Sequence, residues 1–500
     1  MQHQKSNSPT VTTPATKAVS SSRLSIILAL ITLAQFMVVV DSTIVQVALP
    51  SVGRDFAVSV NGLQWLVTAY GLTLAGFLML SGRLGDIYGH KKLFIIGILL
   101  FSLASLTGGL APSETVLILA RVVQGLGAAM ASATGLSILA RAFPEGKERN
   151  RALSVFSAAT GSGFAAGMVL GGAITATLGW RWVFDINVPI GIAVSLLSIK
   201  YISVGATRRT YENRSHLDIF GAISVTAGLM LLVYSLNSAQ NIGIGSLQTI
   251  GLLLSSVVVL AAFLLIEYRS KTPLMPLGFL RRGSIFGANA VGLLQVGSFV
   301  GMIFILTNYL QQVRGYSALS TGLAFLPMGI VFLAVSAFLS ARLVDRFGVK
   351  HIIISGMALQ TIGYLLLSPI SLTESYIGGL LVPTLIIAFG TGLGFTAINI
   401  AALTGTRRVE EGLASGLINT SRQIGGPIGL AVLLTVTNLV TPPSTGQLAV
   451  QSSAVMAMMT GFGYAFLAAA VLTGIGIIIT ALLKQKRHRQ AEIAPTIHQN

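Results

Sequence analysis

Long apolar runs, separated by short polar segments, recur along nearly the whole chain. A helix needs about 20 apolar residues to cross roughly 30 Å of hydrocarbon, and an open strand in lipid would leave its backbone groups unpaired. The pattern therefore predicts an all-α polytopic membrane protein with fourteen spans. These cover residues 24–48, 62–81, 92–111, 115–140, 152–178, 183–203, 218–238, 246–267, 285–312, 320–342, 351–369, 376–404, 413–438 and 458–483.

The composition requires lipid as the solvent for most of the chain. Of the 500 residues, 53% are hydrophobic and 9% are charged, whereas about a quarter of the residues of a soluble domain are charged. Cysteine is absent, which excludes disulfides, thiolate metal sites and a cysteine nucleophile. Residues 1–22 are rich in Ser, Thr and Pro, so they predict a disordered cytoplasmic tail and no signal peptide.

The Lys and Arg residues set the expected orientation. With the N-terminus inside, all but five of the 32 lie on the cytoplasmic side; the exceptions are Arg54, Arg181 and Arg314 outside, and Arg121 and Arg422 within spans. Short cytoplasmic loops carry such an excess of positive charge. We expect both termini in the cytoplasm and a bacterial inner (plasma) membrane. The net charge of +17 then needs no nucleic acid as a partner.

An internal repeat divides the spans into two halves. The segment Gly82–Lys92 after the second span resembles Ala341–Lys350 after the tenth, and Gly-Leu-Gly recurs at residues 125–127 and 392–394. Parallel repeats of this kind place a substrate site between the halves near the membrane midplane. The predicted units are a tail at 1–22, six-helix halves at 23–203 and 284–484, a linker with two extra helices at 204–283, and a cytoplasmic tail at 485–500.

Asp41 is the one acid, of fifteen, that lies well inside a predicted span. A carboxylate at that depth costs several kcal/mol unless it is paired, hydrated or protonated. Arg121, in the fourth span, lies at a similar depth and is the expected partner. Because burial disfavours the charged carboxylate while a nearby cation favours it, Asp41 is a candidate proton carrier poised by Arg121. The alternative is an ion pair that only fixes helix packing.

A second polar face is predicted on the thirteenth span. Asn419, Arg422 and Gln423 have i, i+3, i+4 spacing, so they share one side of a helix. This face is expected to point to a substrate cavity or to the other half, with simple helix association as the alternative. The further candidates for the cavity lining are Gln124, Asn289, Gln295, Asn308 and Asn399.

The repeated loops are candidate gates. A carboxylate between helix ends can dock on a helix N-terminus or on an arginine of the opposite half, and so hold the inner side closed; a solvated loop charge is the alternative. In the fifth span, glycines at four-residue spacing allow close helix packing. The gating candidates are Gly82, Asp86, Gly89, Lys91, Asp345, Gly348 and Lys350, and the packing candidates are Gly163, Gly167, Gly171 and Gly172.

Other energy sources and chemistries find no support. The chain has no G-x-x-x-x-G-K-[ST] phosphate loop, and its histidines (3, 90, 216, 351, 488 and 498) fall in predicted tails or loops. ATP hydrolysis, a buried histidine relay and a metal site are therefore not expected. We expect no cofactor, an ion gradient as the energy source, and tryptophans at the outer boundaries (Trp65, Trp180 and Trp182) as interfacial anchors.

Taken together, these motifs resemble the major facilitator superfamily, and within it the fourteen-span drug:proton antiporters, from about Leu24 to Lys484. Asp41–Pro50 (DSTIVQVALP) is similar to the family's first-span motif, whose Asp is implicated in proton handling. Gly82–Lys92 is similar to its gating loop, and the Arg121-x-x-Gln124-Gly pattern to its fourth-span motif for proton coupling. In the family's fifth-span antiporter motif a proline stands where this chain has Met168.

The resemblance implies export of amphipathic organic compounds, cationic or neutral, in exchange for protons by alternating access, as in multidrug efflux and antibiotic resistance. The alternative is an exporter of an anionic metabolite, lipid or siderophore that Arg121 and Arg422 recognise. A non-transporting membrane sensor or scaffold is a third, and an enzyme is not expected. The substrate, the proton stoichiometry and the oligomeric state stay open.

Overall fold

A computed structural model describes residues 21–143, 147–202, 219–242, 246–270, 273, 278, 283–369, 375–403, 411–440 and 451–483. Almost all of the predicted tails and a large part of the predicted linker, including residues 203–218, lie outside this described part. Helices account for nearly all of the described residues, as the apolar runs predict. The fold class is thereby confirmed.

Each predicted span coincides with one helix or with consecutive helical segments. The N-terminal half holds α1 (Ser21–Phe56), α2 (Val60–Tyr88), α3 (His90–Gly109), α4 (Glu114–Ala142), α5 (Lys147–Thr177), α6 (Trp182–Asp185) and α7 (Asn187–Tyr201). Then come the inserted helices α8 (Ile219–Ile242) and α9 (Leu247–Arg269). The C-terminal half holds α11 (Gly283–Asn308), η1 (Tyr309–Val313), α12 (Ala318–Ala334), η2 (Val335–Leu339), α13 (Ser340–Phe347), α14 (Val349–Leu367), η3 (Tyr376–Leu381), α15 (Val382–Leu403), α16 (Glu411–Val440) and α17 (Gln451–Leu482).

Eleven helical stretches of the described chain are long and apolar enough to cross a membrane. Helices α5 and α8 contribute the shorter apolar stretches Ser162–Thr177 and Ile223–Ser235. Helix α16, whose apolar sequence is interrupted by the polar run Asn419–Gln423, falls in neither group. The count of fourteen spans therefore stays a prediction with which these helices agree.

The two halves pack alike, as the sequence repeat predicts. Helix α3 lies against α4 in one half, and α14 lies against α15 in the other. In both pairs glycines allow the backbones to touch: a Cβ on Gly97 would meet the backbone of Gly127, and one on Gly356 would meet that of Gly394. The Gly-Leu-Gly repeat thus marks equivalent close contacts between helices.

The most extensive contacts between the halves are those of α2 with α16 and of α5 with α12, and α1 also contacts α11 and α12. Hydrophobic clusters that combine both halves, such as the cluster of Val47 and Met168 with Met302, lie toward the side that the sequence predicts to face outside. Two other clusters lie toward the predicted inner side, and each draws on one half alone. Among the described residues, shared hydrophobic clusters therefore join the halves on the outer side and not on the inner side.

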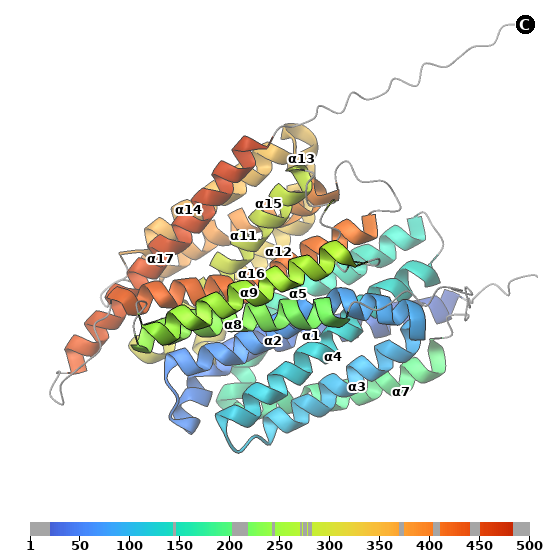
Figure 1. The fold of residues 1–500 in the computed structure, drawn as a ribbon, viewed down its shortest axis with the longest axis horizontal. Helices are drawn as coiled ribbons and strands as arrows, with labels where there is room; N and C mark the ends of the chain where they lie inside the picture. The colour runs from blue at the N-terminus through green and yellow to red at the C-terminus, as the bar shows by residue number, and fades with distance from the viewer. Residues whose placement is uncertain are drawn as a thin grey trace, which may run out of the picture.

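The inserted hairpin of α8 and α9 lies across the seam between α2 and α16. Figure 1 shows both helices in green between the N-terminal half (blue and cyan) and the C-terminal half (yellow to red). Leu229 and Val233 of α8 pack with Leu72 of α2 and Ala431 of α16. Helix α9 is mostly exposed and apolar, as expected of a surface in contact with lipid. Only α8 therefore covers the seam directly.

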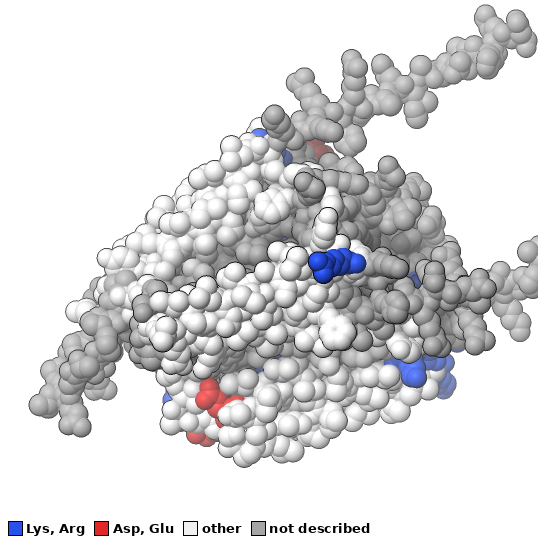
Figure 2. All heavy atoms as spheres, in the orientation of Figure 1, with Lys and Arg blue, Asp and Glu red and all other residues white. Residues whose placement is uncertain are grey.

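The face of the molecule in Figure 2 carries few charged side chains. It is largely uncharged, with the most prominent acidic side chains at the lower left and the most prominent basic side chains at the centre right and lower right. This distribution agrees with a helical bundle whose middle lies in lipid.

Two histidines that the sequence places in loops lie instead at the starts of helices. His90 is the buried first residue of α3, and His351 is an exposed residue in the first turn of α14. These helices begin earlier than the apolar runs because polar residues form their first turns.

The three tryptophans differ in their surroundings. Trp182 is exposed, whereas Trp65 packs its ring against Tyr234 of α8, with 6.0 Å between the ring centres, and Trp180 is 6% exposed and donates to Asp55. Their role as interfacial anchors stays a prediction.

Candidate functional site

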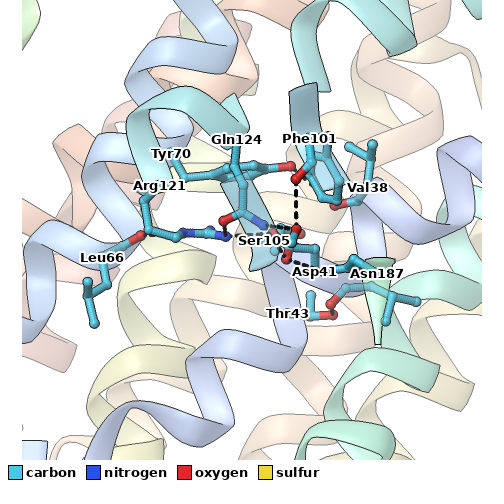
Figure 3. A network of polar contacts seen from close by, with 12 residues as sticks. Val38, Asp41, Thr43, Leu66, Tyr70, Phe101, Ser105, Arg121, Gln124 and Asn187 are labelled. Carbon is cyan, nitrogen blue, oxygen red and sulfur yellow. Dashed lines mark hydrogen bonds and ion pairs between the residues drawn. The ribbon is translucent and has the colours of Figure 1, made fainter. Parts of the chain in front are cut away.

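A buried polar network surrounds Asp41 in the N-terminal half (Figure 3). The side chain of Asp41 is 0% exposed and that of Arg121 is 1% exposed. Arg121 Nη1 lies 2.6 Å from Asp41 Oδ2, so the pair that the sequence predicts is formed. On the other carboxylate oxygen, Oδ1, Gln124 Nε2 donates at 3.1 Å and Asn187 Nδ2 at 2.9 Å.

The guanidinium of Arg121 is held on several sides. Its Nε donates to the carbonyl of Leu66 at 2.9 Å, and its Nη1 also lies 3.0 Å from Gln124 Oε1. The ring of Tyr70 lies against it, with 4.1 Å between Arg121 Cζ and the ring centre. A buried ion pair is stable only when its remaining donors and acceptors are satisfied, and here α2 and α4 supply most of them.

Close contacts between helices bring the network together. A Cβ on Gly125 would meet the backbone carbonyl of Tyr70, and one on Gly127 would meet the backbone of Phe101. These glycines let α4 approach α2 and α3, so that Gln124 reaches Ser105 Oγ at 2.7 Å. Gln124, predicted to line a substrate cavity, is instead fully buried in this network.

The helices α6 and α7 cover the network from the predicted outer side. Asn187, the first residue of α7, bonds Asp41, and Phe184 of α6 lies 6.0 Å from Arg121 Cζ, measured to its ring centre. Near the end of α1, Asp55 accepts from Trp180 Nε1 at 3.0 Å and from Arg181 Nη1 at 2.7 Å. The sequence does not predict that Asn187 belongs to this network. The only indication is a polar side chain near the start of the sixth span.

The predicted cavity residues of the C-terminal half separate into two groups. Arg422 donates to Asn399 Oδ1 at 2.8 Å and to the carbonyl of Phe395 at 2.7 Å, and Asn289 accepts from Ser421 at 2.8 Å. Asn419 is exposed and Gln423 half-buried on the same helix. Gln295 and Asn308 are 0% exposed, so their predicted position on a cavity wall does not hold in this structure.

The repeated loops contact the ends of helices in their own halves. Lys91 Nζ donates to the carbonyl of Ile199 near the end of α7 at 2.8 Å, and Lys350 Nζ donates to that of Ala481 near the end of α17 at 2.6 Å. A cation at a helix C-terminus satisfies its free carbonyls and opposes its dipole. The two lysines therefore hold equivalent helix ends in the two halves.

The other gating candidates are less constrained. Gly89 and Gly348 have φ angles of 96° and 83°, where a Cβ would be strained, and Gly82 has open space around it. The side chain of Asp86 lies outside the described part. The latch between the halves therefore stays a prediction for Asp86, and the described side chain of Asp345 is exposed to solvent.

The four glycines of α5 that the sequence predicts to pack against helices face two different partners. Gly163, Gly167 and Gly171 lie against α1, where a Cβ would meet Val39, Thr43 and the carbonyl of Ile44. Gly172 lies against Ala318 of α12, across the boundary between the halves. Met168, at the position of the antiporter motif's proline, is buried, and its carbonyl lies against Gly322 of α12.

Comparison with known proteins agrees with this architecture. The chain is 38% identical over 443 residues to a cephamycin export protein of Amycolatopsis lactamdurans, covering 88% of this chain and 90% of that protein. It is 36% identical to a puromycin resistance protein of Streptomyces alboniger, covering 91% and 90%. A bacterial homologue of the human lysosomal transporter Spinster, solved inward-facing and occupied, superimposes with a TM-score of 0.66 at 15% identity, covering 93% and 97%.

The sequence profile of the family to which such carriers belong extends over most of the chain. It matches residues 31–430, a range that begins in α1 before Asp41 and ends in α16 after Arg422. The chain is accordingly a transporter and not an enzyme. It belongs to the Major Facilitator Superfamily.

Proposed function

We propose that this protein exports amphipathic organic compounds across the bacterial inner membrane in exchange for protons, with both termini in the cytoplasm. The observation that carries the proposal is the fully buried Asp41, held by Arg121, Gln124 and Asn187. The two relatives are named for cephamycin export and puromycin resistance, which supports an organic substrate.

Proton exchange at Asp41 would change the forces within the N-terminal half. As a carboxylate, Asp41 accepts charge-assisted hydrogen bonds from three side chains, which are stronger than neutral ones. Once protonated it no longer balances Arg121, and a buried cation without its partner is costly. The proton therefore favours a different arrangement of α1, α4 and α7, the helices that supply these groups.

Alternating access would couple that rearrangement to substrate movement. Among the described residues, hydrophobic clusters combine the two halves on the predicted outer side and stay within one half on the inner side, which supports a carrier that takes up its substrate from the cytoplasm. Protonation from outside would accompany release, and deprotonation to the cytoplasm would reset the carrier. Asp86 and Asp345 are the proposed latches of the inner side in the opposite state.

Dye efflux driven by a proton gradient tests the proposal. Asp41→Asn keeps the shape of the side chain and removes its charge, so we expect gradient-dependent efflux from everted vesicles or cells to fall to the level of the empty vector. The matched control is Asp55→Asn, the same exchange at an acid that is 45% exposed at the outer end of α1, which should keep efflux within about twofold of wild type. If folded Asp41→Asn shows wild-type efflux, Asp41 is not the proton carrier.

A further inference from the structure

Arg422 is a buried cation that no carboxylate neutralises among the described side chains. It is 5% exposed, its Nη1 and Nη2 donate to a neutral amide and a backbone carbonyl, and its Nε has no partner. In the C-terminal half the acids, Asp345, Glu374, Glu410 and Glu411, all lie in or next to the loops between predicted spans. Arginine stays charged in proteins, so the site retains an uncompensated positive charge.

One aromatic ring lies against this cation, and a series of ring contacts leads from it to the other half. Arg422 Cζ lies 4.0 Å from the ring centre of Phe395, whose ring is 5.7 Å from that of Phe332. Phe332 in turn is 6.0 Å from Phe164 of α5 and 6.4 Å from Phe299. We call Phe164, Phe299, Phe332 and Phe395 the aromatic cluster; its members come from α5, α11, α12 and α15.

The aromatic cluster lies at the inner edge of the hydrophobic contacts that the two halves share. Phe164, Phe299 and Phe332 each stand near the centre of their predicted spans, and Phe164, Phe332 and Phe395 are partly exposed. On the inner side of this level the hydrophobic clusters no longer combine the two halves. Polar groups of the C-terminal half follow there, including the bonded pair Ser336 and Thr396 and the exposed Asn419. A compound entering from the cytoplasm would meet polar groups first, then the rings and Arg422.

We propose that Arg422 and the aromatic cluster form the substrate-recognition site, and that it selects amphipathic compounds carrying a carboxylate or similar anionic group on an aromatic frame. This inference rests on the proposed export function and names its substrate class. It replaces the expectation of cationic or neutral substrates, because no acid of the C-terminal half lies within a predicted span to balance a cationic substrate.

The chemistry favours an anion over a purely structural role for Arg422. A buried charge without a partner is destabilising, and a carboxylate ligand would supply both the opposite charge and an acceptor for a free guanidinium N–H. The neighbouring rings offer stacking surfaces for a planar frame. Arg121, the other buried arginine of the described chain, is occupied by Asp41 at 2.6 Å, which leaves Arg422 as the available cation.

Two probes of matched shape test the inference on the purified full-length protein. Pyrenebutyrate carries a carboxylate, and its primary amide, pyrenebutyramide, is neutral. We expect wild type to bind the acid at least tenfold more tightly, and Arg422→Gln to remove that preference by weakening the acid alone, since a hydrogen bond to a charged group is worth about ten- to a hundredfold in affinity. Arg422→Lys should retain part of the preference, and Phe332→Leu should weaken both probes.

The control is Arg54→Gln, which removes an exposed arginine at the outer end of α1 and should leave both affinities unchanged. Each variant is compared by its melting temperature, so that Arg422→Lys can report on charge if Arg422→Gln does not fold. Equal binding of the two probes by wild type, binding of neither, or an equal loss of both in Arg422→Gln would overturn the inference. Binding needs no proton gradient, so these results are separate from the Asp41→Asn efflux test.

Discussion

At the scale of single residues, the network around Asp41 depends on neutral donors as much as on the ion pair. Asn187 and Gln124 both donate to Asp41 Oδ1, while Arg121 contacts Oδ2. Hydrogen bonds to a carboxylate favour its charged form over its protonated form. Asn187 stands on α7, directly beneath α6, so it also links Asp41 to the segment that covers the network on the outer side.

Asn187→Ala is therefore expected to weaken proton-driven transport without weakening substrate binding. The variant removes one of the two donors to Asp41 Oδ1, and because a hydrogen bond to a charged group is worth about 1.5–3 kcal/mol, gradient-driven efflux should fall about tenfold while substrate affinity measured without a gradient stays at the wild-type value. The control is Thr43→Val, since the Thr43 hydroxyl bonds only carbonyls of its own helix and its loss should leave efflux in place. Wild-type efflux by folded Asn187→Ala would show that Asn187 has no positioning role.

The sequence predicts some of these residues and cannot predict others. Charged groups are so rare within the predicted spans that the similar depth of Asp41 and Arg121 is enough to predict that they pair. Asn187 and Ser105 are neutral residues of ordinary kinds, and only the packing of α3, α4 and α7 brings them to the pair. Arg422 was found in the same way as Arg121, but the ring of Phe395 beside it depends on the contact of α15 with α16.

At the scale of helices, α5 packs within its own half on one side and across the halves on another. Apolar run lengths predict such helices well, because the thickness of the bilayer fixes them. They do not predict interruptions such as η2, which divides the tenth span between α12 and α13, nor which helix a glycine faces. Adjacent glycines of α5 show this: Gly171 contacts α1, whereas Gly172 contacts α12.

The same substitution at these two positions is expected to have different results. Gly171→Ala places a methyl group against the backbone of Ile44 inside the N-terminal half, and overpacking there should destabilise the protein by about 1–3 kcal/mol. Gly172→Ala places it against Ala318 across the halves, where the two bodies can separate. We expect a lower melting temperature for Gly171→Ala, and for Gly172→Ala a smaller change with greater access of a thiol reagent to a cysteine introduced at Thr321, which is buried on α12. The reverse pattern would contradict the assignment of the two faces.

At the scale of the whole molecule, the two halves and the inserted hairpin form three bodies with unequal freedom. The main seams between the halves are formed by α2 with α16 and by α5 with α12. Helix α8 packs on both helices of the first seam. Opening the outer side must therefore disturb the contacts of α8, while the seam of α5 and α12 has no such covering helix among the described residues. The repeat explains why the halves can move as bodies, since each has its own hydrophobic cluster at the inner end.

Distances between spin labels should report that movement directly. Because the chain has no cysteine, labels attach only at introduced ones, and exposed positions are available at both ends. One pair joins Tyr88 to Phe347 at the inner ends, and another joins Leu178 to Ser317 at the outer ends. We expect Asp41→Asn, which imitates the protonated carboxyl, to shorten the inner distance and lengthen the outer one in nanodiscs. The pair Leu178 and Leu110, both in the N-terminal half, should keep its distance. If the inner and outer distances change in the same direction, or do not change, the charge of Asp41 does not control the alternation of the halves.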